Sequence, residues 1–163
     1  YILKGWTRPR RYKYDTMPKF NVTVQREGAS GNSGKRINKH EERCREIFEG
    51  LFKQPFPSQR PDFLKNPTTG RNLELDGWCT KSFFKMYPNG IAFEYDGEQH
   101  AKYSPYFHKS VKDFEYQVHR DKYKDAVCHQ KGILLIRIPH FVAYSDLERY
   151  IKVKIKNIAN KIR

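Results

Sequence analysis

The stretch GILLIRIP (132–139) carries the strongest signal for the fold class. Its aliphatic residues run almost without interruption between Gly132 and Pro139, which is typical of a strand buried on both faces of a sheet. Residues 111–130, directly before it, have the pattern of a helix, and Gly132 is suited to end that helix. A helix that leads at once into a buried strand favours an α/β fold.

Further elements are predicted on the N-terminal side of this stretch. A helix is expected to start after Asn38, an N-cap residue that has Glu41 three positions later in the capping-box position. Its hydrophobic residues recur at helical spacing: Cys44, Ile47, Phe48, Leu51 and Phe52. Two strands are predicted next, at 72–78 and 90–96.

A last helix is predicted at the C-terminal end of the sequence. Ser145 and Glu148 have the spacing of a capping box there. The hydrophobic stripe of this helix consists of Leu147, Ile151, Ile155, Ile158 and Ile162. The order helix, strand, strand, helix, strand, helix predicts an α/β fold with a mixed central sheet flanked by helices.

Charge divides the chain into two parts. The 163 residues carry a net charge of +14, which favours an acidic partner such as a nucleic acid. Residues 1–40 contain ten Lys or Arg against Asp15 and Glu27, and the small residues GASGNSG (28–34) are typical of a flexible linker. We therefore expect a basic arm with its linker at 1–36 and a folded domain at 37–163. The arm is either a phosphate-binding segment or a solvated tail.

Composition argues against several classes of protein. The longest aliphatic run, Ile133 to Ile136, is far shorter than the roughly 20 residues that cross a bilayer, so no membrane partner is expected. The three cysteines lack the CxxC spacing of a zinc site or redox pair. An odd number of unclustered cysteines favours an intracellular, reducing compartment, either cytoplasm or nucleus, over secretion.

Acidic residues gather at the ends of the two predicted strands. Glu94 and Asp96 share one face of their strand by period-two alternation. If the strand that ends near Asp76 pairs with it, three carboxylates form a group suited to Mg²⁺. The alternative is that these acids form salt bridges with the many lysines and arginines.

Three motifs together resemble the PD-(D/E)xK superfamily of restriction-endonuclease-like domains. They are LDGW (75–78), AFEYDGEQH (92–100), and RDK (120–122) with the strand 132–139. The match is closest to a branch that carries an EYDGEQH segment and is similar to very short patch repair endonucleases. The resemblance implies a metal-dependent phosphodiesterase, with Asp76 as the acid of the first motif and Glu94 as the acid of the second.

The sequence departs from this family pattern at the motif lysine, because Asp96 stands in its place. We assign the role of that lysine to Gln99 or His100. His100 is expected to act as a general base or to hold the attacking water. The resemblance also implies a further active-site acid from the first helix, for which Glu41 is the candidate and Glu42 the fallback. Capping of the helix is the alternative explanation for Glu41.

These observations predict a Mg²⁺-dependent DNA endonuclease or nickase, in which Mn²⁺ can replace Mg²⁺. Catalysis is assigned to Glu41, Asp76, Glu94, Asp96, Gln99 and His100, and metal binding to Asp76, Glu94 and Asp96. Contacts with the DNA backbone are assigned to Arg10, Arg11, Lys35, Arg36, Lys102, Lys109, Lys112, Lys122 and Lys124. The alternatives are a non-catalytic nucleic-acid-binding module on the same fold and a basic structural protein of a nucleoprotein particle.

Overall fold

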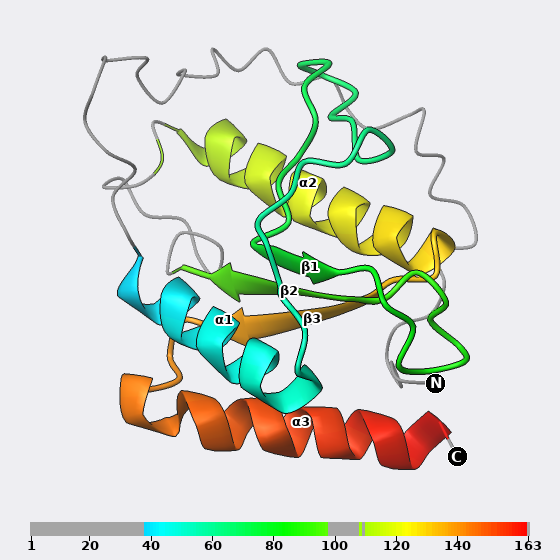
Figure 1. Cartoon of the computed structure of the whole chain (residues 1–163). Coiled ribbons are helices and arrows are strands. Elements are labelled where there is room, and N and C mark those ends of the chain that lie inside the picture. Colours follow the sequence, from blue (N-terminus) through cyan, green and yellow to red (C-terminus); the bar gives the residue numbers. More distant parts are fainter. Residues whose placement is uncertain (1–37, 98–107, 109, 163) are drawn as a thin grey trace, which may run out of the picture.

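The computed structural model describes residues 38–97, 108 and 110–162 (Figure 1). The predicted basic arm at 1–36 lies outside these residues. Within them the chain forms three α-helices and a three-stranded mixed sheet, which confirms the α/β prediction. In this part of the chain no helix is long and apolar enough to cross a membrane.

The sheet has the strand order β1-β2-β3. Strand β1 (Gly77–Cys79) pairs antiparallel with β2 (Ile91–Asp96), which pairs parallel with β3 (Leu134–Pro139). The prediction of a strand at 72–78 was wrong in its extent. Leu75 and Asn72 make only isolated bridges, with Gln59 and Lys65, so the chain before residue 77 is held outside the sheet.

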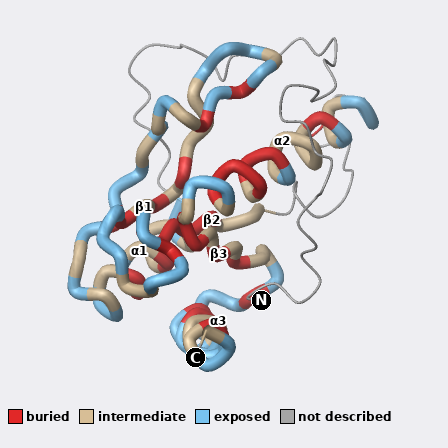
Figure 2. Tube along the Cα trace, turned by 90° about the vertical axis from the view of Figure 1, so that its right-hand side faces the viewer, coloured by how far each residue is buried: buried red, intermediate tan, exposed pale blue. Residues whose placement is uncertain are grey.

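The helices cover both faces of the sheet (Figure 1). Helices α1 (Lys39–Phe52) and α3 (Leu147–Ile162) lie on one face, and α2 (Val111–Gln130) lies on the other. The first face packs Phe48 and Ile151 against Phe93, while the second packs Tyr123 against Ala92. Figure 2 shows that buried residues concentrate along the strands and the inner sides of the helices.

Local sequence signals explain two of the three helix starts. The Asn38 side chain accepts hydrogen bonds from the backbone N–H groups of His40 and Glu41 at the start of α1. The Ser110 side chain accepts one from the backbone N–H of Asp113 at the start of α2, which has the predicted bounds. The capping box predicted at Ser145 is replaced by a short 3-10 turn (Tyr144–Asp146) that leads into α3. Glu148 forms ion pairs with Arg43 and Lys152 instead.

The topology brings the ends of several strands and helices to one edge of the molecule. Strands β2 and β3 end there, β1 begins there, and the N-termini of all three helices lie at the same edge (left in Figure 1). Asp76 immediately precedes β1, and Glu94 and Asp96 lie in the last half of β2. The fold therefore brings the predicted acids to one end of the sheet.

Candidate active site

Asp76 is held at the start of β1 by contacts with two other elements. Its Oδ2 accepts a hydrogen bond of 2.8 Å from the backbone N–H of Tyr95 on β2. The Arg45 guanidinium on α1 donates to the backbone carbonyls of Asp76, at 2.8 Å, and of Phe56, at 2.6 Å. Gly77 lies so close to the Phe93 ring that a Cβ atom there would overlap it, so glycine lets the chain approach β2 at this point.

Glu94 is buried and paired with a lysine from α2. Its Oε1 lies 2.7 Å from Lys124 Nζ, and Lys124 Nζ also donates to the Glu74 carbonyl at 2.6 Å. Glu94 is 6% exposed and Lys124 is 8% exposed. Charges that are buried to this degree are expensive unless they are paired and hydrogen-bonded, and this pair meets both conditions.

Burial and crowding change the pKa values of both acids. The pKa of Asp76 is raised to about 6, first because the carboxyl is buried and also because the Glu41 carboxyl lies beside it; the Tyr95 N–H and Lys124 oppose this rise. The pKa of Glu94 is raised to about 7, mainly by burial and also by the charge of Asp76, against the effect of Lys124. Perturbed acids that share one site are a frequent property of functional centres.

Glu41 is the acid of α1 that faces Asp76. Its side chain is 17% exposed, whereas that of Glu42 is 47% exposed, and both contact Arg45, at 3.6 Å and 3.5 Å. Asn38, and not Glu41, caps the start of this helix. The Glu41 carboxyl instead lies near Asp76 and is one of the causes, after burial, that raise the pKa of Asp76. The structure therefore brings Glu41, and not Glu42, to the site.

Asp96 forms an ion pair with an arginine on the neighbouring strand. Its Oδ1 lies 2.8 Å from Arg137 Nη1, and the same guanidinium contacts Asp125 at 2.7 Å and the Asp121 carbonyl at 3.1 Å. Asp96 shares the α2 face of the sheet with Glu94, as the alternation predicts. Among the described residues, no three His, Cys, Asp or Glu side chains form a group that could hold a metal ion alone. The predicted three-carboxylate group is therefore absent from this part of the chain, because Arg137 holds Asp96.

The other predicted site residues divide into two groups. The following lie outside the described residues: Arg10, Arg11, Lys35, Arg36, Gln99, His100, Lys102 and Lys109. Lys112 and Lys122 are exposed on α2, where they can meet a ligand from solvent. Lys124 was predicted on the same surface, but the structure buries it against Glu94.

The lysine beside Glu94 was not predicted, although the sequence contains a signal for it. Lys124 lies in the apolar stripe of α2, three and four residues before Val127 and Cys128, which are both buried. A lysine on the buried side of a helix needs an anionic or carbonyl partner. Helical spacing therefore predicts that it is paired, but the identity of the partner depends on how α2 packs on the sheet.

Asp76 and Glu94 are the ligand type that a magnesium ion uses when most of its coordination comes from water. The Tyr95 N–H binds Asp76 Oδ2 and Lys124 binds Glu94 Oε1, while the Glu41 carboxyl also lies against the Asp76 carboxyl. Mg²⁺ commonly binds proteins through one or two carboxylates, with water and substrate phosphate completing its coordination. Asp76 and Glu94 have the donor chemistry that such an ion requires.

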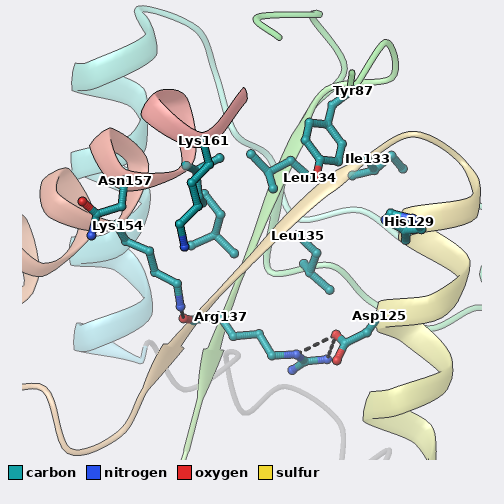
Figure 3. Close-up of a pocket in the computed structure, with 12 residues that line it drawn as sticks. Tyr87, Asp125, His129, Ile133, Leu134, Leu135, Arg137, Lys154, Asn157 and Lys161 are labelled. Atoms are coloured by element: carbon teal, nitrogen blue, oxygen red, sulfur yellow. Dashed lines mark hydrogen bonds and ion pairs between the residues drawn. The ribbon is translucent and has the colours of Figure 1, made fainter. Parts of the chain in front are cut away.

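A pocket of about 320 Å³ lies elsewhere, along the outer edge of β3 between α2 and α3 (Figure 3). Asp125 and Arg137 line it on one side, and Lys154 and Lys161 of α3 line it on the other. Asp76, Glu94 and Lys124 are not among its lining residues. The acidic group at the strand ends is thus a separate feature of the molecule.

The fold and this site define an α/β protein with a buried carboxylate–lysine pair beside further acids at the end of its sheet. Comparison with known proteins shows that the chain is similar to uncharacterized proteins of iridoviruses. It is 38% identical over 116 residues to uncharacterized protein 094L of Frog virus 3 (isolate Goorha), and the match covers 71% of this chain and 69% of the relative. The chain belongs to the family that includes this protein.

Two further relatives come from invertebrate viruses. Identity to uncharacterized protein 033L of Invertebrate iridescent virus 3 is 35% over 130 residues, which is 79% of this chain and 63% of the relative. Identity to uncharacterized protein 307L of Invertebrate iridescent virus 6 is 37% over 123 residues, which is 69% of this chain and 58% of the relative. The chain thus spans about three fifths of the length of these two proteins. No family model and no solved structure matches the chain.

Proposed function

We propose that the chain is a Mg²⁺-dependent nuclease domain of the PD-(D/E)xK type that cuts or nicks DNA. The observation that carries this proposal is the contact between Lys124 Nζ and Glu94 Oε1 beside Asp76. In the usual motif a lysine follows the second acid by two positions, and here Asp96 occupies that position. Lys124 brings an ammonium group to the same acid from α2, so the motif's set of charges is complete without a lysine at position 96.

The grouping of acids supports a functional site over simple ion pairing. Salt bridges account for the partners of Glu94 and Asp96, as the alternative interpretation expected. They do not account for Asp76, which accepts a backbone N–H and whose pKa is raised first by burial and then by the Glu41 carboxyl beside it. Like charges held together at a cost in stability are typical of sites that bind a cation.

Each group has a defined part in the proposed chemistry. A Mg²⁺ or Mn²⁺ ion held by Asp76 and Glu94 would neutralise the phosphate charge and lower the pKa of a bound water. Lys124 orients Glu94 and would supply a positive charge beside the two acids to offset negative charge that develops in the transition state. Glu41 supplies a further acid from α1, and Gln99 or His100 is proposed to position the attacking water.

Asp96 and the lysines complete this proposal. Asp96 is proposed to act by orienting Arg137, with metal ligation as the alternative. Lys112 and Lys122 are proposed to contact the DNA backbone from the exposed side of α2, as are Lys102, Lys109 and the basic residues of the arm. Backbone contacts of this kind give affinity that does not depend on sequence and falls with salt.

The cellular setting of the protein is also a proposal. The three cysteines are free and buried, and burial raises the pKa of the Cys44 and Cys128 thiols to about 12. Thiols of this kind are inert core residues, which supports an intracellular, reducing compartment.

A non-catalytic DNA-binding module on the same fold is the competing proposal. It is supported by the charge of +14 alone, and it leaves unexplained why acids gather where a phosphate would bind. Incubation of supercoiled plasmid with the full chain and Mg²⁺ separates the two proposals. The parent chain is expected to produce nicked or linear DNA, whereas Asp76→Ala and Glu94→Ala bind the plasmid at least as well and leave it intact. Binding without cleavage by the parent chain would establish the module instead.

A further inference from the structure

Aromatic side chains form a patch at the same end of the sheet as the acids. The His40 ring stacks on Tyr95, with centroids 5.5 Å apart and planes at 23°, and it meets Tyr144 edge-on at 5.5 Å. Lys39 Nζ lies 4.7 Å from the centroid of the Tyr144 ring. We call Lys39, His40, Tyr95 and Tyr144, together with Phe141 three residues before Tyr144 in the chain, the aromatic patch.

The aromatic patch is interleaved with the acids along the chain. His40 directly precedes Glu41, and Tyr95 stands between Glu94 and Asp96. The backbone N–H of Tyr95 is also the group that holds Asp76. Because side chains alternate along β2, the Tyr95 ring packs toward α1 and α3 while Glu94 faces α2. The patch and the acids therefore border each other across the end of one strand.

Two rings of the patch are left uncovered. Phe141 is 76% exposed, and it lies two residues after Pro139, which pairs in register with Asp96. Tyr144 is 40% exposed in the turn before α3. Phe48, Phe93 and Ile151 are buried in the hydrophobic core of this face, and Phe141 is not a member of that core. Large exposed rings beside a functional site are typical of a surface that contacts a ligand.

We propose that the aromatic patch stacks an unpaired nucleobase that flanks the phosphate held at Asp76 and Glu94. The inference rests on the proposed nuclease function and names its substrate class: DNA with unpaired bases, as in a flap, a bulge or a single strand. Aromatic rings hold unpaired bases of any sequence by stacking, whereas the bases of an intact duplex are already stacked on each other.

The charge of the patch favours DNA over an apolar protein segment. Lys39 is exposed beside Tyr144, and it supplies a cation for the phosphate that accompanies each base. The described acids directly next to the rings in sequence each pair with a basic residue: Glu41 with Arg45, Glu94 with Lys124 and Asp96 with Arg137. A ligand that is both planar and anionic matches this combination.

Binding without cleavage tests the proposal apart from the nuclease function. The probes are two DNAs of the same sequence, one fully paired and one with an unpaired flap that carries 2-aminopurine, each titrated with the full chain in EDTA. The parent chain is expected to bind the flap DNA about tenfold more tightly and to quench the 2-aminopurine, since one stacked base is worth about this factor or more. Phe141→Ala and Tyr144→Ala are expected to lose most of this preference.

Val153→Ala is the matched control, because Val153 is 51% exposed on α3 away from the patch. This variant is expected to keep the preference for flap DNA. Equal binding of both DNAs by the parent chain, or full preference in both patch variants, overturns the proposal. A preference for flap DNA in a chain that does not cleave with Mg²⁺ would support the patch and reject the nuclease function. Cleavage without such a preference would reject the patch alone.

Discussion

Lys124 Nζ lies 2.7 Å from Glu94 Oε1, although the two residues are 30 positions apart and belong to a helix and a strand. The contact fixes α2 against the sheet at the point where Asp76 also lies. It gives the buried Glu94 a counter-ion that the local sequence around Glu94 lacks. The segment YDGEQH (95–100) that follows Glu94 contains no lysine or arginine, so the ammonium group of the proposed nuclease site comes from α2.

Replacement of Lys124 by methionine tests the pair directly. Lys124→Met keeps the length of the side chain but removes its charge, so Glu94 loses its ion-pair partner in a buried setting and its pKa rises further. We expect the rate of plasmid nicking in Mg²⁺ at neutral pH to fall about 100-fold, a loss typical of removing one charge-stabilising group. Lys156→Met is the matched control because Lys156 is an exposed lysine of α3 for which no DNA contact is proposed, and it should keep the rate of the parent chain. Equal losses in both variants would remove the special role of Lys124.

Nicking should increase with pH across the neutral range. The pKa values of Asp76 and Glu94 are raised to about 6 and about 7, so both acids are protonated in acid solution and must ionise before they bind a cation. The rate at a subsaturating Mg²⁺ concentration should rise between about pH 5.5 and about pH 8 and then level off. Higher Mg²⁺ should shift this rise to lower pH, because the ion competes with the protons. A rate that does not vary with pH, or a midpoint that Mg²⁺ does not move, would argue against metal binding by these acids.

The acids should also reduce the stability of the metal-free fold above neutral pH. The folded-state pKa of Asp76 is above its ordinary value, so its favourable contribution is complete below about pH 4 and is lost as pH rises through about 6. Asp76→Asn keeps an oxygen to accept the Tyr95 N–H. This variant should increase the free energy of unfolding by about 1–3 kcal/mol at about pH 8 and by much less at about pH 4.

Urea unfolding in EDTA at the two pH values measures this difference. Asp62→Asn is a suitable control, because Asp62 is an exposed acid away from the site. If Asp76→Asn lowered the free energy of unfolding at high pH, the conclusion that Asp76 is held at a cost in stability would be wrong.

Asp96 should contribute more to stability than to chemistry. Arg137 is largely buried between Asp96 and Asp125, so Asp96→Asn leaves it with one of its two acidic partners. We expect the free energy of unfolding to fall by about 1–3 kcal/mol, since a buried arginine would then be only partly compensated. Nicking by Asp96→Asn should stay within about tenfold of the parent rate, whereas Glu94→Ala abolishes it. Loss of nicking in both variants, with Asp96→Asn still stably folded, would make Asp96 a metal ligand.

The basic arm should contribute affinity for DNA and not catalysis. Deletion of residues 1–36 removes nine lysines and arginines and so should weaken DNA binding. The slope of the plot of log K against log salt concentration should become shallower by about 0.9 for each lost phosphate contact. Nicking at saturating protein should change little. If the slope of that plot is the same with and without the arm, the arm is a solvated tail.

Local signals predicted most of the fold. Asn38 predicted the start of α1, and the pattern at 111–130 gave both ends of α2. The first strand was predicted too long because Leu75 looks like a strand residue but pairs with Gln59 outside the sheet. A strand pattern indicates which residues can be extended, but their hydrogen-bond partners depend on the tertiary fold.

The candidate site was predicted less completely than the fold. Alternation along β2 placed Glu94 and Asp96 on one face, and the structure agrees. Their partners, Lys124 and Arg137, could not be chosen from spacing because both contacts cross between separate elements. Any of the chain's 32 lysines and arginines was a possible partner until the packing of α2 and β3 was known.

The most direct test of the nuclease proposal is a comparison of the parent chain with Asp76→Ala, both purified in the same way. Each is incubated with supercoiled plasmid in excess protein, with Mg²⁺ or with EDTA, and the first-order rate of nicking is measured. The proposal predicts nicking by the parent chain in Mg²⁺ alone and none by Asp76→Ala, while both proteins bind the plasmid. Equal rates for the two proteins, or binding by the parent chain without any nicking in Mg²⁺ or Mn²⁺, would contradict it.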